Sequence, residues 1–533
     1  MSPFPTEVPV VIVGAGPTGL TTANLLARYG VDCLLLERDG GPMNLPRAIV
    51  IDDEGARVLQ VFGLDRTYLK GTMEGIGSRY YDDAGNCFAE TGRGPRNFGF
   101  AKRQFIFQPE LEAALRDRLE EQAPGTLRFG AEVTEIRQEG DTALVTVTDP
   151  DGRRHQIRTG WVLACDGGRS PIRESLGIPM SGNTYEEDWI VVDTRNDPDD
   201  SLFSKFFCSD VRPTVSVPAP NGGRRYEFML LPGETREQAM SDEMLSGLMA
   251  PLRPWRPEDI IRRTVYTFHA RMAEQFRAGR ILLMGDAAHL TPPFAGQGMN
   301  AGLRDAHNVA WKVAVHVLGG AADRLDSYEA ERRAPAWDMI QLAVAMGSIV
   351  MPAGRDQIVF RDLLLKALQP FPNVRDYLIQ MRFKPKPRYR AGLFLGLDAP
   401  ELDASLVGEM IPQPELAGAA PGLLDEALGP GFALIAQDGG GAAALEALEQ
   451  TSLMGLPLAK VVLDTTGCGA GLVPADATVA RPFRTHRDQI MLIRPDRYCA
   501  AAVAPGALGQ MLKDYAAALG GATTGRQVER LTA

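Results

Sequence analysis

The sequence has 533 residues, which is long enough for two or three domains with sizeable cores. Hydrophobic residues make up 45% and charged residues 23%, a balance typical of globular proteins rather than of disordered chains. The formal net charge of -11 argues against a nucleic-acid-binding protein, which would need a basic face, but it leaves room for an anionic small molecule held by a few local arginines.

The cysteines and the N-terminal segment predict a cytoplasmic protein without metal or membrane partners. Residues 8–27 carry no charge, but Glu7 stands where a signal peptide has basic residues, and three glycines interrupt the apolar run. The six cysteines lack the close pairs of metal sites and the density of secreted disulfide frameworks. They are Cys33, Cys87, Cys165, Cys208, Cys468 and Cys499.

The first forty residues predict a βαβ unit. Residues 8–13 are apolar and β-branched, as expected of a parallel strand buried on both faces. A glycine turn follows, residues 20–29 have helical spacing with Gly30 as a stop signal, and residues 33–37 form a second short strand.

The rest of the chain alternates between β-rich and helical regions. We predict a β-meander, a β-rich middle region, a buried strand, a helical region, a basic proline-broken linker and a smaller αβ segment. In chain order these are residues 127–163, 185–275, 281–284, 300–350, 382–389 and 403–533.

The glycine turn of the βαβ unit predicts a dinucleotide site. Gly14 allows the tight turn, Gly16 lets backbone amides approach a pyrophosphate, and Gly19 permits close packing of helix on strand. Glu37 ends the second strand at the spacing expected for an acid that binds ribose hydroxyls. The next residue, Arg38, is also a candidate for cofactor binding.

Three later motifs distinguish between dinucleotides. An NAD dehydrogenase would continue with further βαβ repeats, but here a meander leads into residues 164–173, ACDGGRSPIR. Much later come residues 285–289, GDAAH, and residues 292–300, PPFAGQGMN. In this order the motifs resemble the class A flavoprotein aromatic hydroxylases, the group that includes para-hydroxybenzoate hydroxylase.

The resemblance implies an FAD site and assigns its residues. Asp286 would bind the ribityl chain, and the backbone around Gly298, Met299 and Asn300, after Pro293, would face the pyrimidine edge of the flavin ring. Asp166 and Arg173 belong to the motif that serves both FAD and the nicotinamide cofactor in this class. Two further residues match positions near the pyrophosphate and the ribityl chain, respectively: Arg47 and Gln108.

A closer resemblance, over nearly the whole chain, is to the 3-(3-hydroxyphenyl)propionate hydroxylase subgroup. The matching stretches are residues 166–168, 189–193, 225–229, 231–235, 381–385 and 494–497. This subgroup hydroxylates a phenol with an acidic side chain beside the existing hydroxyl, giving a catechol. Its C-terminal segment is thioredoxin-like, but here Cys468 and Cys499 do not form a Cys-x-x-Cys pair, so we expect no redox exchange by it.

The expected fold is therefore α/β, with a Rossmann-like FAD-binding domain, an interleaved β-rich substrate domain and a C-terminal thioredoxin-like domain. The FAD-binding domain would comprise residues 1–75, 100–184 and 275–395. The substrate domain would comprise residues 76–99 and 185–274, and the third domain residues 403–533.

The implied reaction uses FAD, NADH or NADPH (NADH slightly favoured) and O2, and it demands a site that binds a phenolic acid. Arg224 or Arg225 is a candidate to hold the substrate carboxylate, and His269 or Tyr226 to accept or relay the phenol proton. Both arginines equally fit a solvated sheet face, and His269 fits an ordinary strand histidine.

Three alternatives remain open at this stage. A hydroxylase of fused aromatic polyketides uses the same flavin motifs, although residues 189–193 and 225–229 favour the phenylpropionate type. An NAD-dependent dehydrogenase explains only the first glycine motif, and a flavin-binding sensor would not need the motif around Asp166. A homodimer is left open as the assembly.

Overall fold

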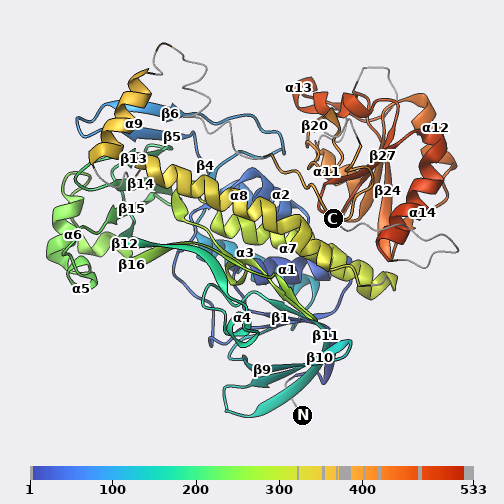
Figure 1. Ribbon diagram of the computed structural model, residues 1–533, viewed down its shortest axis with the longest axis horizontal. Helices are drawn as coiled ribbons and strands as arrows, with labels where there is room; N and C mark the ends of the chain where they lie inside the picture. Colours follow the sequence, from blue (N-terminus) through green and yellow to red (C-terminus); the bar gives the residue numbers. More distant parts are fainter. Residues whose placement is uncertain are drawn as a thin grey trace.

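The computed structural model describes residues 4–320, 323–350, 355–367, 370, 386–399, 404–417, 422–465 and 471–520. These residues form a mixed α/β protein with two large sheets and a smaller C-terminal domain, which lies at the right of Figure 1. None of the helices in these ranges is long and apolar enough to cross a membrane.

The predicted βαβ unit is confirmed at the centre of the first sheet. Strand β1 (Glu7–Val13) pairs in parallel with β2 (Cys33–Leu36), and helix α1 (Pro17–Tyr29) connects them. The helix ends at Gly30, which has a φ of 77°, a left-handed conformation that favours glycine. Residues Val10 to Ile12 have no exposed surface, which explains why β1 is apolar on both faces.

The predicted meander is also confirmed, and it returns the chain to the middle of this sheet. The strand order is β17-β18-β11-β1-β2-β8, and the antiparallel strands β9 and β10 extend β11. Their bounds are β8 Leu127–Arg128, β9 Glu132–Glu139, β10 Thr142–Thr148, β11 Arg154–Ala164, β17 Arg277–Ala278 and β18 Ile281–Leu283.

Three parallel strands of this sheet end at the same edge. Val13 of β1 is in register with Ala164 of β11, and Ala164 is in register with Leu283 of β18. The glycine turn and the segments that contain Asp166 and Asp286 follow these strands, so the fold brings these three motifs together where ligands bind in open α/β sheets.

The second sheet has the order β19-β16-β12-β15-β14-β13-β5-β6. Strand β12 runs through the expected domain boundary at residues 184 and 185, with an irregularity in its pairing to β16 between residues 184 and 188. The bounds are β5 Ser78–Tyr81, β6 Cys87–Thr91, β12 Met180–Thr194, β13 Ser204–Phe207, β14 Thr214–Ala219, β15 Gly223–Met229, β16 Ile260–Ala273 and β19 His289–Leu290.

The two faces of this second sheet are buried against different elements. On one face Ile190, Tyr226 and Phe228 pack with the short helices α5 (Arg236–Ala239) and α6 (Asp242–Met249). On the other face an aromatic cluster packs against the turn at Phe294 and the end of helix α8. Its members include Tyr80, Phe105, Trp189, Phe206, Phe268, Phe294, Met346 and Val350.

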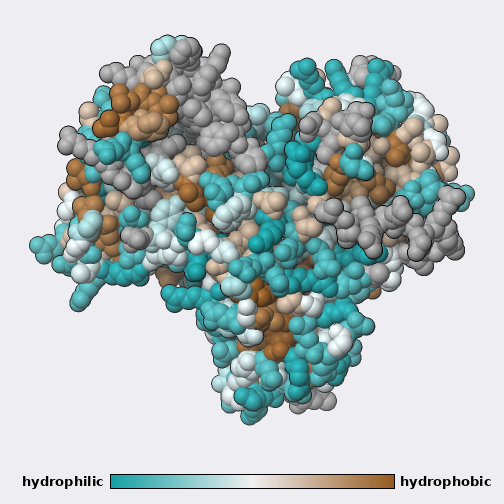
Figure 2. Space-filling view, viewed as in Figure 1, coloured by the Kyte–Doolittle hydropathy of each residue, from teal (hydrophilic) through white to brown (hydrophobic). Residues whose placement is uncertain are grey.

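Two long helices cross the centre of the molecule (Figure 1). Helix α7 (Gly298–Gly319) is buried over most of its length and packs on α1, where a Cβ on Gly302 would overlap Thr18. Helix α8 (Asp326–Val350) lies beside it. Helix α9 (Arg355–Ala367) exposes apolar side chains, including 68% of Phe360, within the brown area at the upper left of Figure 2.

The C-terminal domain contains a five-stranded sheet with the order β23-β24-β22-β26-β27. Helices α12 (Gly439–Ala447) and α14 (Leu508–Ala518) accompany it. Cys499 is buried in this sheet as a free thiol, whereas Cys468 lies outside the described residues. The strands are β22 Phe432–Ala436, β23 Ser452–Leu453, β24 Leu456–Val462, β26 Ile490–Ile493 and β27 Cys499–Val503.

Buried ion pairs connect this domain to α8, α7 and helix α2 (Asp53–Gln60). Arg494 lies 2.7 Å from Glu331 of α8 and 2.5 Å from Asp496, and Lys312 of α7 lies 2.8 Å from Glu331. Burial opposes the ionised form of Glu331, but Arg494 and Lys312 outweigh it and lower its pKa to about 2. Glu331 is therefore ionised at neutral pH, and its ion pairs join α8 to α7 and to the C-terminal domain.

We expect Arg494→Met to lower the free energy of unfolding by about 3–5 kcal/mol, because it leaves Glu331 and Asp496 buried without their common partner. The matched control is Arg236→Met, which removes an ion pair to Asp188 from a side chain that is 58% exposed. Exposed pairs contribute about 0–1 kcal/mol. Chemical denaturation measures both changes, and equal losses would contradict this assignment.

Candidate functional site

The glycine turn after β1 contains two glycines that the protein itself requires and one that it does not. A Cβ on Gly14 would overlap the carbonyl of Cys165, and a Cβ on Gly19 would overlap the carbonyl of Gly14. Nothing lies within 4 Å of the position of a Cβ on Gly16. Gly16 also precedes α1, whose N-terminus has no side-chain cap, so the amides there remain available to a ligand.

Glu37 follows β2 and turns its carboxylate back to the glycine turn. It accepts hydrogen bonds from the amides of Ala15, at 2.8 Å, and Asp39, at 3.0 Å. Arg38 is exposed beside it. The structure therefore brings Glu37 to the glycine turn, beside Ala15.

The segment after β11 presents a buried acid with one unused oxygen. Oδ2 of Asp166 accepts a hydrogen bond from the Ile172 amide at 3.2 Å, while Oδ1 is buried without a partner among the described residues. Burial raises the pKa of this carboxyl. Arg173 donates to the carbonyls of Gly168 and Ala287, both at 3.1 Å, and thereby ties this segment to the turn that carries Asp286.

Asp286 follows β18 at the edge where the three parallel strands end, and its surroundings indicate a concave site, called the cleft below. Its side chain is accessible, yet the protein surrounds it closely enough that burial raises its pKa. The turn is held from behind by Asp305, which accepts hydrogen bonds from the Gly285 amide at 2.9 Å and pairs with His289 at 2.7 Å and Arg332 at 2.8 Å. His289 thus supports the turn.

The N-terminus of α7 borders the same cleft. Pro293 is exposed, Gly298 and Met299 are partly buried, and no side chain caps the helix. The buried amide of Asn300 fixes this end: it accepts a hydrogen bond from the Asp52 amide at 3.1 Å and donates to the carbonyls of Val50 and Gly296.

Gln108 and Arg225 hold the loop that contains Arg47. Oε1 of Gln108 accepts a hydrogen bond from the Ala48 amide at 2.6 Å. Arg225 donates to the carbonyls of Arg47, at 2.6 Å, and Pro46, at 3.0 Å. The side chain of Arg47 is exposed and close enough to Asp286 to lower the pKa of that carboxyl, although burial dominates.

The predicted substrate role of Arg224 and Arg225 is contradicted by their contacts. The two side chains do leave β15 on opposite sides, as the alternation of a strand requires. Arg225 forms a buried ion pair with Asp193 at 2.7 Å, and Arg224 is buried among Asp199, Ser201 and Ser216. Both guanidinium groups are engaged by the protein, so their roles are structural.

The predicted catalytic role of Tyr226 is also wrong. Its hydroxyl donates to Asp197, and its ring packs on the face covered by α5 and α6, away from Phe294. Burial and the nearby Asp197 raise its pKa. The residue cannot reach a ring bound on the other face of the sheet.

His269 does not join the aromatic cluster. It follows Phe268 on β16 and so leaves the strand on the opposite side, where Nδ1 lies 3.0 Å from the Thr184 hydroxyl. Burial, with smaller contributions from Arg271 and Arg169, lowers its pKa. A direct contact with a ring held against Phe268 is contradicted by this placement.

Phe294 is the centre of the aromatic cluster and was not predicted as a site residue. Its ring centroid lies 5.5 Å from that of Phe268, 6.0 Å from Trp189 and 6.2 Å from Tyr185. Because it follows Pro293 in the turn before α7, it joins the dinucleotide cleft to the second sheet. The sequence gives one signal: an aromatic residue inside the Pro-Pro-x-Ala-Gly turn.

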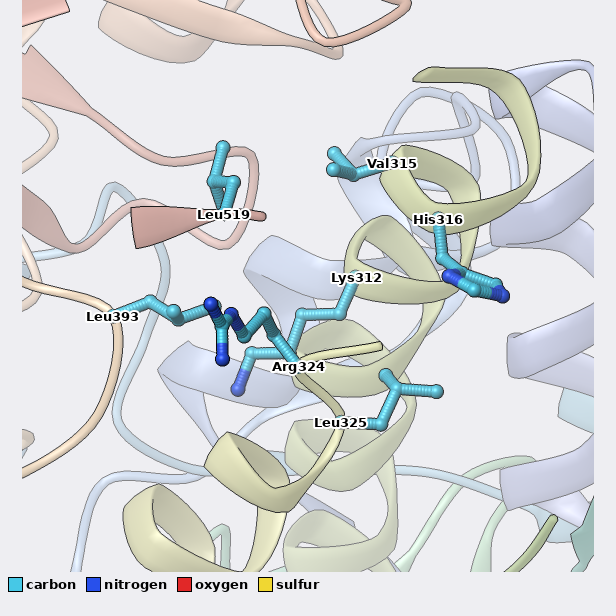
Figure 3. A pocket seen from close by; sticks show the side chains of 7 residues that line it. All are labelled: Lys312, Val315, His316, Arg324, Leu325, Leu393 and Leu519. Atoms are coloured by element: carbon cyan, nitrogen blue, oxygen red, sulfur yellow. The ribbon is translucent and has the colours of Figure 1, made fainter. Parts of the chain in front are cut away.

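A separate small cavity lies away from this cleft, where α7 meets the C-terminal domain (Figure 3). Lys312 and His316 of α7 line it together with Arg324, Leu393 and Leu519. Lys312 is twelve residues along α7 from Asn300, which corresponds to about 18 Å of helix. The cavity is therefore not part of the candidate site.

Comparison with known proteins finds families and relatives that match most of the chain. A family model described as FAD binding domain matches residues 7–343, and one described as HcaD C-terminal domain matches residues 408–518. The 3-(3-hydroxy-phenyl)propionate/3-hydroxycinnamic acid hydroxylase of Klebsiella pneumoniae is 38% identical over 94% of this chain and 93% of its own length. The protein of that name from Escherichia coli O139:H28 is 37% identical over 96% of this chain and 95% of its own.

Solved structures share the fold. The flavin-dependent monooxygenase PieE, in complex with FAD and substrate, has a TM-score of 0.78 at 22% identity and covers 96% of this chain and 99% of its own. Aklavinone-11 hydroxylase, in complex with FAD and aklavinone, has a TM-score of 0.78 at 24% identity and covers 97% of this chain and 99% of its own.

The contacts of the glycine turn make a paired prediction. Gly14→Ala should destabilise the protein even without ligand, because its Cβ would overlap the Cys165 backbone. Gly16→Ala should leave the unfolding of the ligand-free protein within about 0.5 kcal/mol of wild type. It should nevertheless weaken FAD binding at least tenfold by filling the space over the turn. Denaturation and FAD titration of both apoproteins decide the matter, and tight FAD binding by Gly16→Ala would refute it.

Proposed function

Because the chain belongs to the FAD binding domain family and is a flavin-dependent aromatic hydroxylase, we propose that it hydroxylates a phenol with an acidic side chain, such as 3-(3-hydroxyphenyl)propionate, beside the existing hydroxyl. NAD(P)H, with NADH slightly favoured, would be the electron donor and O2 the cosubstrate. The proposal is supported by 38% identity over nearly full length to enzymes named for this substrate.

One observation supports FAD most directly: unsatisfied polar groups converge on a single cleft. These groups are the uncapped N-termini of α1 and α7, the unpaired Oδ1 of Asp166 and the accessible carboxylate of Asp286. A dinucleotide offers a pyrophosphate, sugar hydroxyls and a ring edge to these groups. The open space over Gly16 admits the pyrophosphate.

Bound FAD, once reduced, supplies the activation of O2 that lets one oxygen atom be transferred to an electron-rich ring. The chain's own residues orient the reacting groups and shield them from water. The N-terminus of α7 stabilises negative charge at the adjoining ring edge, and Asn300 holds that end in place through the Asp52 amide. The cluster around Phe294 is apolar and excludes water from the place where the aromatic ring would lie.

The C-terminal domain is proposed to be thioredoxin-like and to act structurally. A central sheet with α12 and α14 supports this interpretation. Its buried Cys499 has a pKa raised by burial to about 12, so its thiol is a poor nucleophile.

Hydroxylation of a fused aromatic polyketide is the second candidate. The structural relatives named for such compounds, aklavinone-11 hydroxylase and anhydrotetracycline hydroxylase, are 24% identical and share the fold, whereas the phenylpropionate enzymes are about 38% identical. The sequence relationship therefore favours the single-ring acid.

The proposed activity predicts a specific product. Purified protein loaded with FAD should consume NADH and O2 together with 3-(3-hydroxyphenyl)propionate and release the 2,3-dihydroxyphenyl acid, identified by chromatography and mass spectrometry. Anhydrotetracycline serves as the fused-ring comparison. NADH oxidation that yields only hydrogen peroxide with the phenolic acid, but hydroxylated product with the fused-ring compound, would reverse the order of the two candidates.

Removing the Asp286 carboxylate should weaken FAD binding. Asp286→Ala takes away an acceptor for sugar hydroxyls, and an unpaired polar group costs about 1–3 kcal/mol, so the Kd for FAD should rise roughly tenfold or more. Asp286→Asn keeps one acceptor oxygen and should lose less. FAD content after purification and titration of the apoprotein measure the change; full occupancy in the alanine variant would exclude Asp286 from the site.

A further inference from the structure

One arginine near the aromatic cluster differs from its buried counterparts in having no acidic partner. Arg103 donates to the hydroxyls of Ser78, at 2.8 Å, and Ser204, at 3.4 Å, and has no carboxylate partner in the part of the chain that the structure describes. By contrast, many other buried arginines pair with carboxylates. They include Arg57, Arg224, Arg225, Arg253, Arg304, Arg332 and Arg494.

The two serines show which face of the second sheet the Arg103 guanidinium occupies. Ser78 of β5 and Ser204 of β13 are in register with each other, as are Tyr80 and Phe206 two residues further along. Residues two apart on a strand share a face. The rings of Tyr80 and Phe206 stack at 4.9 Å within the cluster that contains Phe294, so Arg103 lies at one end of that cluster.

Arg103 is also connected to the predicted flavin side of the cluster. It precedes strand β7 (Gln104–Phe105), and Phe105 belongs to the cluster and is in register with Val50. The carbonyl of Val50 accepts a hydrogen bond from Asn300 at the start of α7. Phe105 is two residues from Arg103, which corresponds to about 7 Å along a strand. This distance is similar to the length of a short acidic side chain on an aromatic ring.

The surroundings of Arg103 favour an anion. Its side chain is partly accessible but closely surrounded by protein, and burial lowers its pKa. A buried cation without a partner is costly, and a carboxylate can accept two parallel hydrogen bonds from a guanidinium. The serine hydroxyls orient the group without neutralising it.

We infer that Arg103 binds the carboxylate of the aromatic acid substrate and, through it, selects acids over neutral phenols. The inference rests on the proposed function and specifies how the site recognises that substrate class. Arg103 thereby takes the role that the sequence had suggested for Arg224 or Arg225.

The test compares Arg103→Gln with wild type in the FAD-loaded enzyme, using 3-(3-hydroxyphenyl)propionate and the neutral 3-propylphenol. The KM for the acid should rise roughly ten- to a hundredfold, as expected for a lost hydrogen bond to a charged group, with kcat changed less. The KM for 3-propylphenol should stay within threefold of wild type. Arg103→Lys keeps the positive charge but not the paired donors of a guanidinium, so its KM for the acid should lie between those of wild type and Arg103→Gln.

Arg79 provides a matched control. It is the next residue to Ser78 on β5, leaves the strand on the other side and pairs with Glu90 at 3.1 Å. Arg79→Gln should change neither KM. The unfolding midpoint of Arg103→Gln should match or exceed that of wild type, because a purely structural arginine would instead lower it and shift both KM values alike.

Each other outcome decides the matter. An unchanged KM for the acid in Arg103→Gln, or equal increases for acid and neutral phenol, would overturn the inference. If wild type produces no hydroxylated acid, the proposed function fails, and the inference is then judged on binding alone. In that case, titration of the FAD absorbance with 3-(3-hydroxyphenyl)propionate should show binding that Arg103→Gln weakens; no binding to wild type would overturn it as well.

Discussion

The guanidinium of Arg225 connects the second sheet to the loop after β2 that contains Arg47. It pairs with Asp193 on the neighbouring strand and donates to the carbonyls of Pro46 and Arg47, in the loop beside Asp286. Arg262 donates to the same Pro46 carbonyl. A buried guanidinium requires several partners, and here a carboxylate from the second sheet and carbonyls from the loop after β2 supply them. The position of the loop relative to the cleft is thus set by the need to satisfy one buried charge.

The same requirement links the C-terminal domain to the cleft. Arg57 of α2 pairs with Asp425 at 2.7 Å, and α2 begins beside Asn300, because a Cβ on Gly55 would meet the Asn300 side chain. Arg304 of α7 pairs with Glu54 at 2.8 Å and also with Asp52. A chain of ionic contacts therefore runs from the third domain through α2 to the first turns of α7. The C-terminal domain thereby helps to hold the first turns of α7, the helix that borders the proposed FAD site.

Local pattern predicted most of the fold and several of the residues that it brings together at the strand ends. The glycine turn, the apolar strands and Gly30 are each set by residues close in sequence, and Asp166 and Asp286 follow strands whose parallel pairing brings their ends together. The roles of the predicted substrate-binding residues depend instead on partners that are distant in the sequence. Alternation correctly separated Arg224 from Arg225, but Asp193 faces Arg225 only because of the register between β12 and β15. Likewise, Arg103 is distinguished by having no acidic partner among the residues that the structure describes, which no local pattern reveals.

The two ends of the aromatic cluster differ in the polar groups that lie beside them. At one end lie the Phe294 turn and the cleft with its free acceptors, and at the other lies a cation held by two hydroxyls. A ring with an acid at one position and a hydroxyl at another meets both ends only in one orientation, so the carboxylate fixes which carbon faces the cleft. Helix α8 packs closely on Phe294, because a Cβ on Gly347 would lie 3.0 Å from that ring.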